Sequence, residues 1–227
     1  MYQIIADETD FIVINKSANV HFHSQDGSAG AVAQAERDLG YKLYSVHRLD
    51  TMTSGLLILA KSAAAAAEFT RQFSLHQIQK YYLALAQGKP KKKQGWVIGD
   101  MAKSRRSMHK LLRTTDNPAI TQFFSHSIGD GERLYLLKPH SGKTHQLRVA
   151  LASIGTPILG DTLYGGATAD RGYLHAYSLD FQYLDKAYRY TVAPPSCEPF
   201  DSAAVKEQLM TWSQPADLAW PSLKKSS

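Results

Sequence analysis

The chain has 227 residues, a net charge of +6 and one cysteine, Cys197. This length suits one large domain or two small ones and allows a proper hydrophobic core. A single cysteine excludes an internal disulfide and indicates a reducing compartment, and no run reaches the roughly 18–20 apolar residues of a membrane span. Acidic residues interrupt the apolar N-terminus, so no signal peptide is expected. We therefore expect a cytoplasmic protein with no membrane partner.

The predicted elements are many strands with scattered helices, which indicates an α+β fold. In chain order we expect strands at 2–6 and 11–15, a helix at 28–39, a buried strand at 56–60, a helix at 62–74, and strands at 79–87, 119–127 and 133–138. A helix at 144–153, strands at 173–181 and 187–192 and a helix at 203–212 follow. Gly40 should stop the first helix and Ser62 should cap the second. We expect the Ser/Lys-rich C-terminal tail to fray.

The stretch 47–61, His-Arg-Leu-Asp-Thr-Met-Thr-Ser-Gly-Leu-Leu-Ile-Leu-Ala-Lys, is the most informative part of the sequence. It places the carboxylate of Asp50 beside a cationic residue, Arg48, and just before an apolar run that predicts a buried strand. A carboxylate held there by rigid backbone and paired with arginine stays ionised, as a nucleophile or base must. The alternative is that an Arg-Asp pair merely caps a turn.

The positive charge is concentrated in residues 89–113, which hold nine basic residues and one acid, whereas the rest of the chain holds 17 basic and 19 acidic residues. A phosphate backbone is the partner that such a basic segment favours, because each Lys or Arg contact releases a condensed counterion. The alternative is a solvated loop whose charges only confer solubility. We expect phosphate contacts from Lys91, Lys92, Lys93, Arg105 and Arg106.

Three other patterns predict little. Gly142-Lys143-Thr144 resembles the end of a phosphate-binding loop, but position 137, where that motif has its first glycine, is Leu. His21 and His23 alternate as on a strand, yet no further Cys or His completes a zinc site. Asp50 and Asp161 could form a glycosidase pair. Asp161, however, lies in a Gly-Asp-Thr turn, and nothing indicates a carbohydrate groove.

Four segments, in order along the chain, resemble motifs of the RluA-type RNA pseudouridine synthases. Residues 47–57 resemble the family's H-R-L-D-x-x-T-S-G-L-L motif, 80–85 its K-x-Y-x-A segment, 142–148 its G-[RK]-T-H-Q-[LI]-R block and 155–165 its G-x-P-I-x-G-D-x-x-Y-G block. Weaker matches at 11–16 and 174–176 extend the resemblance over roughly residues 2–200. One departure is that Lys16 is followed by Ser17-Ala18-Asn19, where the family often has N-K-P-x-G. The departure removes a rigid proline and a permissive glycine from that loop.

The resemblance implies the pseudouridine-synthase catalytic fold, a long mixed and mostly antiparallel sheet with flanking helices and a central cleft. It implies a catalytic domain over residues 1–200, with 89–113 as a basic insertion, followed by a C-terminal helix and tail over 201–227. Because the catalytic-domain motifs begin within the first fifteen residues, we expect no separate S4 RNA-binding domain, and the catalytic domain itself should grip the RNA.

The resemblance also implies the site residues. Asp50 carries over as the catalytic carboxylate, Arg148 as its partner and Tyr82 as the ring that stacks on the target uracil. Leu174 should pack under the base, and Arg48 should fill the stack when the uridine is flipped out. The implied activity is isomerisation of uridine to pseudouridine in rRNA or tRNA, by a monomer without cofactor or metal. The alternatives are a non-catalytic RNA-binding module of the same fold and a carboxylate-based hydrolase.

Overall fold

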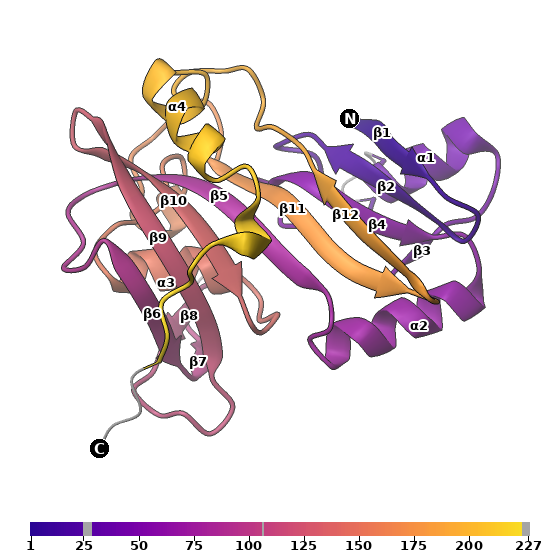
Figure 1. Ribbon diagram of the computed structural model, residues 1–227, viewed down its shortest axis with the longest axis horizontal. Coiled ribbons are helices and arrows are strands. Elements are labelled where there is room, and N and C mark those ends of the chain that lie inside the picture. Colours follow the sequence, from indigo (N-terminus) through magenta and orange to yellow (C-terminus); the bar gives the residue numbers. More distant parts are fainter. Residues whose placement is uncertain (25–28, 106, 224–227) are drawn as a thin grey trace. The chain divides into compact units, whose positions relative to one another are not determined.

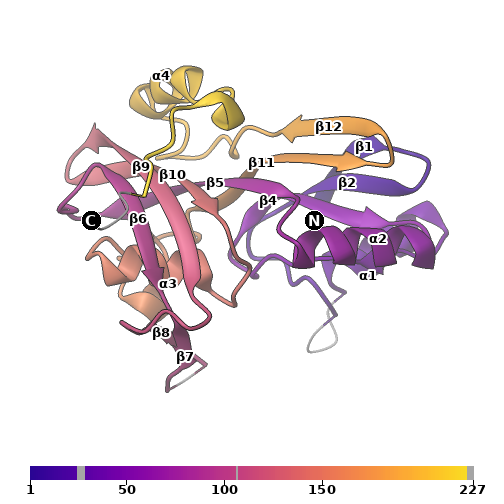
Figure 2. The ribbon, with the colours of Figure 1, turned by 60° about the horizontal axis from the view of Figure 1, so that its bottom comes forward.

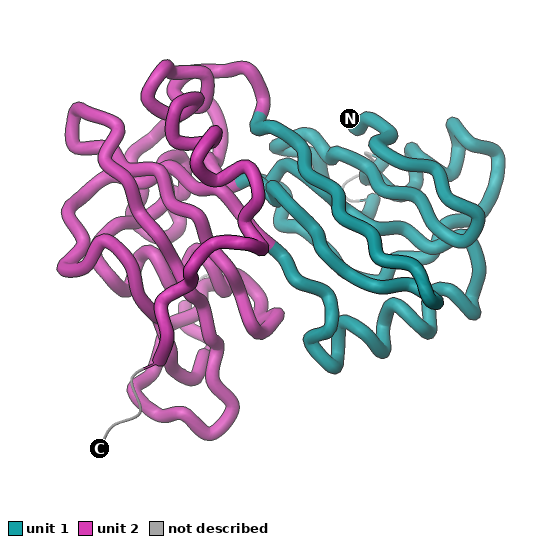
Figure 3. Tube along the Cα trace, viewed as in Figure 1, with its two compact units in different colours: residues 1–80, 175–194 teal, residues 81–174, 195–227 magenta. Residues whose placement is uncertain are grey.

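The structure is a computed structural model that describes residues 1–24, 29–105 and 107–223. Figure 3 shows its two compact units, which interleave along the chain. Unit 1 contains residues 1–80 and 175–194, and unit 2 contains residues 81–174 and 195–227.

Unit 1 is built on a mixed sheet, whose strands are labelled in Figure 1. Its strands are β1 (Tyr2–Asp7), β2 (Phe11–Lys16), β3 (Tyr44–Ser45), β4 (Ser54–Ala60), β11 (Leu174–Tyr183) and β12 (Lys186–Thr191). The order is β1-β2-β4-β11, with β12 beside β11 and β3 beside the end of β4. Among the strand pairs described in unit 1, β4–β11 alone is parallel, and it involves the first two residues of β4. Every residue of β4 is buried, as the apolar run predicted.

The helices of unit 1 are α1 (Ala31–Leu39) and α2 (Ala63–Ser74). Gly40 ends α1 in a left-handed conformation, and the Ser62 hydroxyl accepts from the Ala65 N–H at 3.1 Å to cap α2. Figure 2 shows α2 lying across one face of the unit 1 sheet. There Phe69 packs edge-on against Phe11 and stacks on Tyr183 with ring centroids 4.8 Å apart, so these aromatic rings fix α2 on the sheet.

Unit 2 is built on an antiparallel sheet with the order β5-β10-β9-β6. These strands are β5 (Gln79–Gln87), β10 (Glu132–Pro139), β9 (Ala119–Gly129) and β6 (Gln94–Gly99). A separate hairpin consists of β7 (Met101–Lys103) and β8 (His109–Leu111). The helical elements are α3 (Gln146–Ser153), α4 (Ala203–Thr211) and the single turns Thr162–Tyr164 and Pro215–Asp217.

The two faces of the unit 2 sheet are covered by different segments of the chain. On one face, Gln146 at the start of α3 donates to the Thr121 hydroxyl at 3.0 Å. On the other face, the carbonyl of Pro221 accepts from Trp96 at 2.7 Å and from Gln122 at 2.9 Å, and Trp220 packs on Phe124. The chain after α4 crosses this second face in Figure 1. The tail expected to fray is therefore attached to the sheet as far as Pro221, and residues 224–227 lie outside the described part of the chain.

Several predicted boundaries were wrong by a few residues. The first helix begins at Ala31 behind Gly30, and Ser28 lies outside the described residues. The segment 88–118, for which we predicted no elements, contains β6, β7 and β8. The helix predicted from 144 begins at Gln146, because His145 is left-handed with φ of 58° and precedes the helix. No helix in the described ranges is both long enough and apolar enough to cross a membrane.

Candidate active site

Asp50 lies in unit 1, in the turn that leads into β4. The carbonyl of Asp50 accepts from the Thr53 N–H at 3.0 Å, which closes the turn one residue before the strand begins. The side chain of Asp50 is half-buried, and Leu49 before it is buried with 4% of its surface exposed. The carboxylate is therefore carried by a short turn between two buried anchors, Leu49 and β4.

Lys16 at the end of β2 holds the same turn from beneath. The side chain is fully buried, and its ammonium donates to three backbone carbonyls, those of Ser17 at 3.0 Å, Val20 at 2.8 Å and Thr51 at 3.3 Å. A buried ammonium requires such partners, because an unpaired one is costly to desolvate. Lys16 thus fastens the residue next to Asp50. Our reading of the sequence assigned no role to Lys16, although a lysine that ends an apolar strand was a usable signal.

The start of β4 is fixed against β11 by two small residues. The Ser54 hydroxyl lies 2.8 Å from Nδ1 of the buried His175, whose Nε2 lies 3.0 Å from the Val192 carbonyl. Gly55 has φ of +111°, and a Cβ there would lie 2.3 Å from the Ala176 carbonyl oxygen. Only glycine permits this approach of the two backbones. The Thr-Ser-Gly part of the motif therefore serves the packing of the strand that follows Asp50.

His47 completes the hydrogen bonding of β4 and stays neutral. Its Nε2 accepts from the Ile58 N–H at 2.9 Å, between the residues of β4 that pair with β11 and those that pair with β3. Burial, assisted by the charge of Lys80, lowers the pKa of His47 to about 3. Burial also lowers the pKa of Lys80 to about 8. We conclude that His47 orients the loop before Asp50 and does not titrate near neutral pH.

Arg148 lies in unit 2, in the first turn of α3, and is held by a buried carboxylate. Its Nε donates to Asp161 Oδ2 at 2.7 Å and its Nη2 to Asp161 Oδ1 at 2.8 Å. Only 9% of the Arg148 side chain and 2% of the Asp161 side chain are exposed. The guanidinium also lies over the Tyr164 ring, 5.0 Å from its centroid. Asp161, which we had read as a turn residue only, therefore orients Arg148.

Tyr82 and Arg148 lie on the same side of the unit 2 sheet. In the register of the strands, Tyr82 pairs with Leu137 and Leu137 with Phe123, so these side chains share the face that Thr121 presents to α3. Tyr81 faces the other way, where its ring stacks on Trp220 with centroids 5.9 Å apart. The two tyrosines therefore point to opposite faces, as adjacent residues of a strand do. Tyr82 is half-buried and Leu174 is buried.

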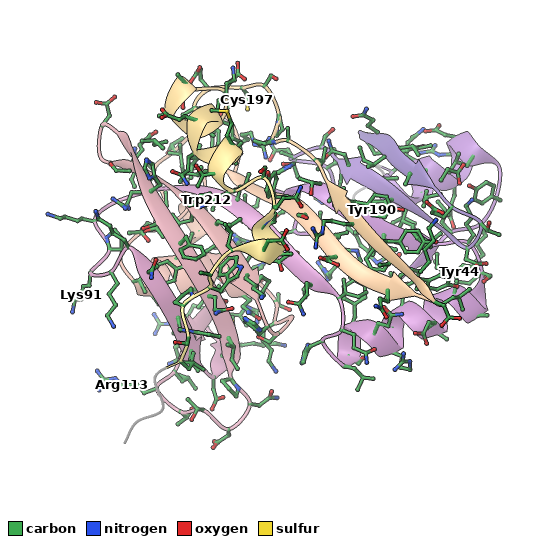
Figure 4. The ribbon with its side chains drawn as sticks, in the orientation of Figure 1. Tyr44, Lys91, Arg113, Tyr190, Cys197 and Trp212 are labelled. Carbon is green, nitrogen blue, oxygen red and sulfur yellow. The ribbon has the colours of Figure 1, made fainter. Side chains whose placement is uncertain are left out.

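The basic residues of segment 89–113 are exposed wherever the structure describes them, and all belong to unit 2. Figure 4 shows Lys91 and Arg113 projecting outward from this unit. They occupy two places: the loop before β6, with Lys91, Lys92 and Lys93, and the hairpin β7–β8 with the turn after it. The hairpin carries Lys103, Arg105 and Lys110, and Arg106 lies outside the described residues.

The predicted site residues thus divide between the units. Arg48, which is exposed, and Asp50 belong to unit 1, while Tyr82, Arg148 and Leu174 belong to unit 2. The pairing of Asp50 with Arg148 stays a prediction. Within residues 1–24, 29–105 and 107–223, no three His, Cys, Asp or Glu side chains are grouped so that they could hold a metal ion.

Comparison with known proteins identifies the family. Residues 10–153 match the model of the family described as RNA pseudouridylate synthase. A Haemophilus influenzae protein named as an uncharacterized RNA pseudouridine synthase is 49% identical over 213 residues, 92% of this chain and 95% of that protein. The dual-specificity RNA pseudouridine synthase RluA of Escherichia coli is 33% identical over 188 residues, 78% of this chain and 84% of RluA.

A solved structure gives the same result for the fold. Human RNA pseudouridylate synthase domain containing 1 superposes with a TM-score of 0.76 at 23% identity, covering 98% of this chain and 97% of that one. The predicted α+β class and pseudouridine-synthase fold are confirmed. The chain belongs to the RNA pseudouridylate synthase family, in its RluA-type branch, and is an isomerase that converts uridine in RNA to pseudouridine.

Proposed function

We propose that the substrate is a uridine in a structured rRNA or tRNA and that Asp50 is the carboxylate that carries the reaction. Relatives named for tRNA and for the ribosomal large subunit support this choice of RNA classes. The observation that carries the assignment of Asp50 is the way its turn is held. The buried ammonium of Lys16 binds the neighbouring Thr51 carbonyl, and the turn opens directly into the fully buried strand β4.

The chemistry requires an anionic oxygen and later a proton acceptor. The N1–C1′ bond of the uridine breaks, the base turns, a C5–C1′ bond forms, C5 loses its proton and N1 gains one. Atoms balance with no net oxidation or reduction, so the proposal includes neither cofactor nor metal. A carboxylate can supply the anionic oxygen, acting either at the sugar or at the base.

Arg148 has the role of orienting this carboxylate. A guanidinium beside a carboxylate holds its two oxygens in fixed directions. Asp161 binds Nε and Nη2 of Arg148, so the plane of the guanidinium is set by the protein. An arginine fixed in this way costs little reorganisation when the transition state forms.

Tyr82 is proposed to stack on the uracil and Leu174 to pack against it. Tyr82 shares the α3 face with the helix that carries Arg148, and it is half-buried, as a ring that accepts a base must be. Exposed Arg48 is proposed to occupy the space that the flipped uridine leaves in the RNA, because the reaction cannot reach a stacked base. Removal of the C5 proton falls to Tyr82, a water molecule or Asp50.

The exposed cations of the two basic regions are proposed to bind phosphates. They include Lys91, Lys92, Lys93 and Arg105, and the same role is proposed for Arg106. Contacts of this kind position an RNA without reading its sequence, so the choice of uridine would come from RNA shape. We further propose that the protein works in the cytoplasm as a monomer.

Tritium release from RNA labelled at uridine C5 tests the proposal. Asp50→Asn is isosteric and removes only the anionic oxygen, so we expect release to fall at least about a hundredfold while RNA affinity is retained. Asp180→Asn is the matched control, because Asp180 lies in an exposed ion pair with Arg189. Release by Asp50→Asn within tenfold of the control would remove Asp50 from this role. Dependence of wild-type release on an added metal or cofactor would contradict the cofactor-free scheme.

A further inference from the structure

The hairpin β7–β8 is the part of the basic segment that is joined to α3. Met101 pairs with Leu111, Ala102 with Lys110 and Lys103 with His109. Because side chains alternate along a strand, Lys110 points away from the face on which His109 lies. The hairpin thus presents the exposed Lys110 on the face opposite His109.

Tyr164 binds the hairpin on one side and the start of α3 on the other. Its hydroxyl oxygen accepts from the backbone N–H of His109 at 2.9 Å and lies 2.8 Å from Nδ1 of His145. The rings of His109 and His145 also meet edge to face, with centroids 5.5 Å apart. His145 is held in a left-handed conformation directly before α3, so its ring position is set by the helix start.

The ring of the same tyrosine supports Arg148. The guanidinium lies 5.0 Å from the Tyr164 ring centroid, and its other support is the bidentate contact with Asp161, three residues before Tyr164. A single aromatic side chain therefore touches the hairpin with its hydroxyl and the catalytic-site arginine with its face. The loop at 88–93 shares none of the contacts described for Tyr164.

We propose that Tyr164 is a positioning residue that couples RNA contact at the β7–β8 hairpin to the placement of Arg148. The inference rests on the proposed function, in which Arg148 orients the catalytic carboxylate. When phosphates of a correctly bound RNA seat the hairpin, the His109 N–H and His145 hold the Tyr164 hydroxyl, and the ring holds the guanidinium. An RNA that binds without seating the hairpin leaves Arg148 less well placed and reacts slowly.

His109 supplies a second, independent observation. Its Nδ1 is buried and has no hydrogen-bond partner among the described residues. A buried polar atom without a partner costs free energy, so a small adjustment of the hairpin that gives Nδ1 a partner would stabilise the hairpin. RNA that seats the hairpin with such an adjustment would therefore strengthen the contact of the neighbouring N–H with Tyr164.

A double-mutant cycle separates coupling from simple loss of affinity. The hairpin variant Arg105→Gln/Lys110→Gln removes two exposed cations, and Tyr164→Phe removes the hydroxyl while keeping the ring over Arg148. The matched control Lys91→Gln/Lys92→Gln removes two exposed cations from the loop before β6, which is not among the contacts described for Tyr164. For each variant, RNA affinity and the single-turnover rate at saturating RNA are measured by tritium release.

We expect the hairpin variant to lower the saturated rate by about fivefold or more, the size of a typical coupling between sites. Tyr164→Phe should lower it comparably, and adding the hairpin changes to Tyr164→Phe should reduce it no further. The loop control should lose affinity but leave the saturated rate of each background, wild type or Tyr164→Phe, unchanged. A saturated rate that the hairpin variant leaves unchanged, or rate losses that multiply, would overturn the coupling.

Two measurements keep these outcomes interpretable. His145→Asn tolerates the left-handed backbone and offers an oxygen near the place of Nδ1, so it should retain most of the saturated rate. Trypsin cleavage after Arg105 should be faster in Tyr164→Phe than in wild type, and equal cleavage rates would also contradict the proposal. The activity of Asp50→Asn distinguishes the two possible failures. If only the coupling is wrong, Asp50→Asn is still inactive; if the proposed function is wrong, Asp50→Asn is active.

Discussion

Replacement of Asp161 by asparagine tests whether the buried ion pair with Arg148 supports the fold as well as the site. Asparagine has the same shape but one acceptor oxygen, and its NH₂ group faces the guanidinium. The bidentate contact, with distances of 2.7 and 2.8 Å, loses at least one bond and all of its charge pairing. Because only 9% and 2% of the two side chains are exposed, water cannot replace what is lost.

Loss of one partner from a buried pair typically costs about 3–5 kcal/mol of unfolding free energy. In a chain of this size that corresponds to a fall in Tm of roughly 6–20 °C. The matched control is Asp180→Asn, because the Arg189–Asp180 pair has similar bond lengths but side chains 42% and 28% exposed. An exposed pair contributes at most about 1 kcal/mol, so the control should stay close to wild type.

Urea unfolding followed by circular dichroism gives both free energies, and equal m values would show that the unfolded states are comparable. At a temperature where Asp161→Asn is folded, tritium release should still be well below that of the Asp180 control, because Arg148 is no longer fixed. If Asp161→Asn unfolds within about 1 kcal/mol of the control, the pair is not the buried support that we derive from its geometry.

Three further outcomes are expected. Neutralising the three lysines 91–93 should lower the slope of log affinity against log salt by about 2–3. An unchanged slope would show that these lysines do not contact RNA phosphates. Tyr82→Phe should keep RNA affinity and slow tritium release if the hydroxyl takes the C5 proton; an unchanged rate would show that only the ring is needed. The pKa of His47 is lowered to about 3 in the folded protein, against 6.5 in the unfolded chain. Between these two pH values, the unfolded chain binds a proton at His47 and the folded protein does not. Its contribution to stability is therefore complete above pH 6.5 and is lost as the pH falls toward 3. Between pH 7 and 4.5 wild type should lose about 2–3 kcal/mol more unfolding free energy than His47→Gln, which keeps an acceptor for Ile58; equal losses would contradict a neutral buried His47.

The elements of the fold could be predicted where local sequence determines them. The run at 56–60 is apolar at every position, and β4 is buried on both faces. Ser62 caps α2 and Gly40 ends α1, because hydroxyl capping and a left-handed glycine are local effects. The start of α3 could not be predicted in this way. His145 adopts a left-handed conformation and contacts Tyr164, which is nineteen residues away in the sequence.

The site was predictable as a set of residue types and not as a set of contacts. The surroundings of Asp50 in the sequence indicated an ionised carboxylate before a buried strand, and the turn has that position. The partner of Arg148 was missed, because Asp161 lies thirteen residues beyond it in a glycine-flanked turn where an acid has an ordinary structural explanation. The hairpin at 101–111 was missed because its three-residue strands are too short to give a period and carry charges instead of apolar residues.

The loop after β2 shows how one sequence can depart from a family pattern and keep its geometry. Asn19 stands where the family often has glycine, and it adopts φ of 60°, the left-handed conformation that asparagine tolerates better than other residues with a side chain. Ser17 stands where the family often has proline, which would stiffen the loop. Here the Lys16 ammonium binds the carbonyls of Ser17 and Val20, on either side of the turn, and so restrains the loop without the ring. Because the same ammonium binds the Thr51 carbonyl, this restraint extends to the turn that carries Asp50.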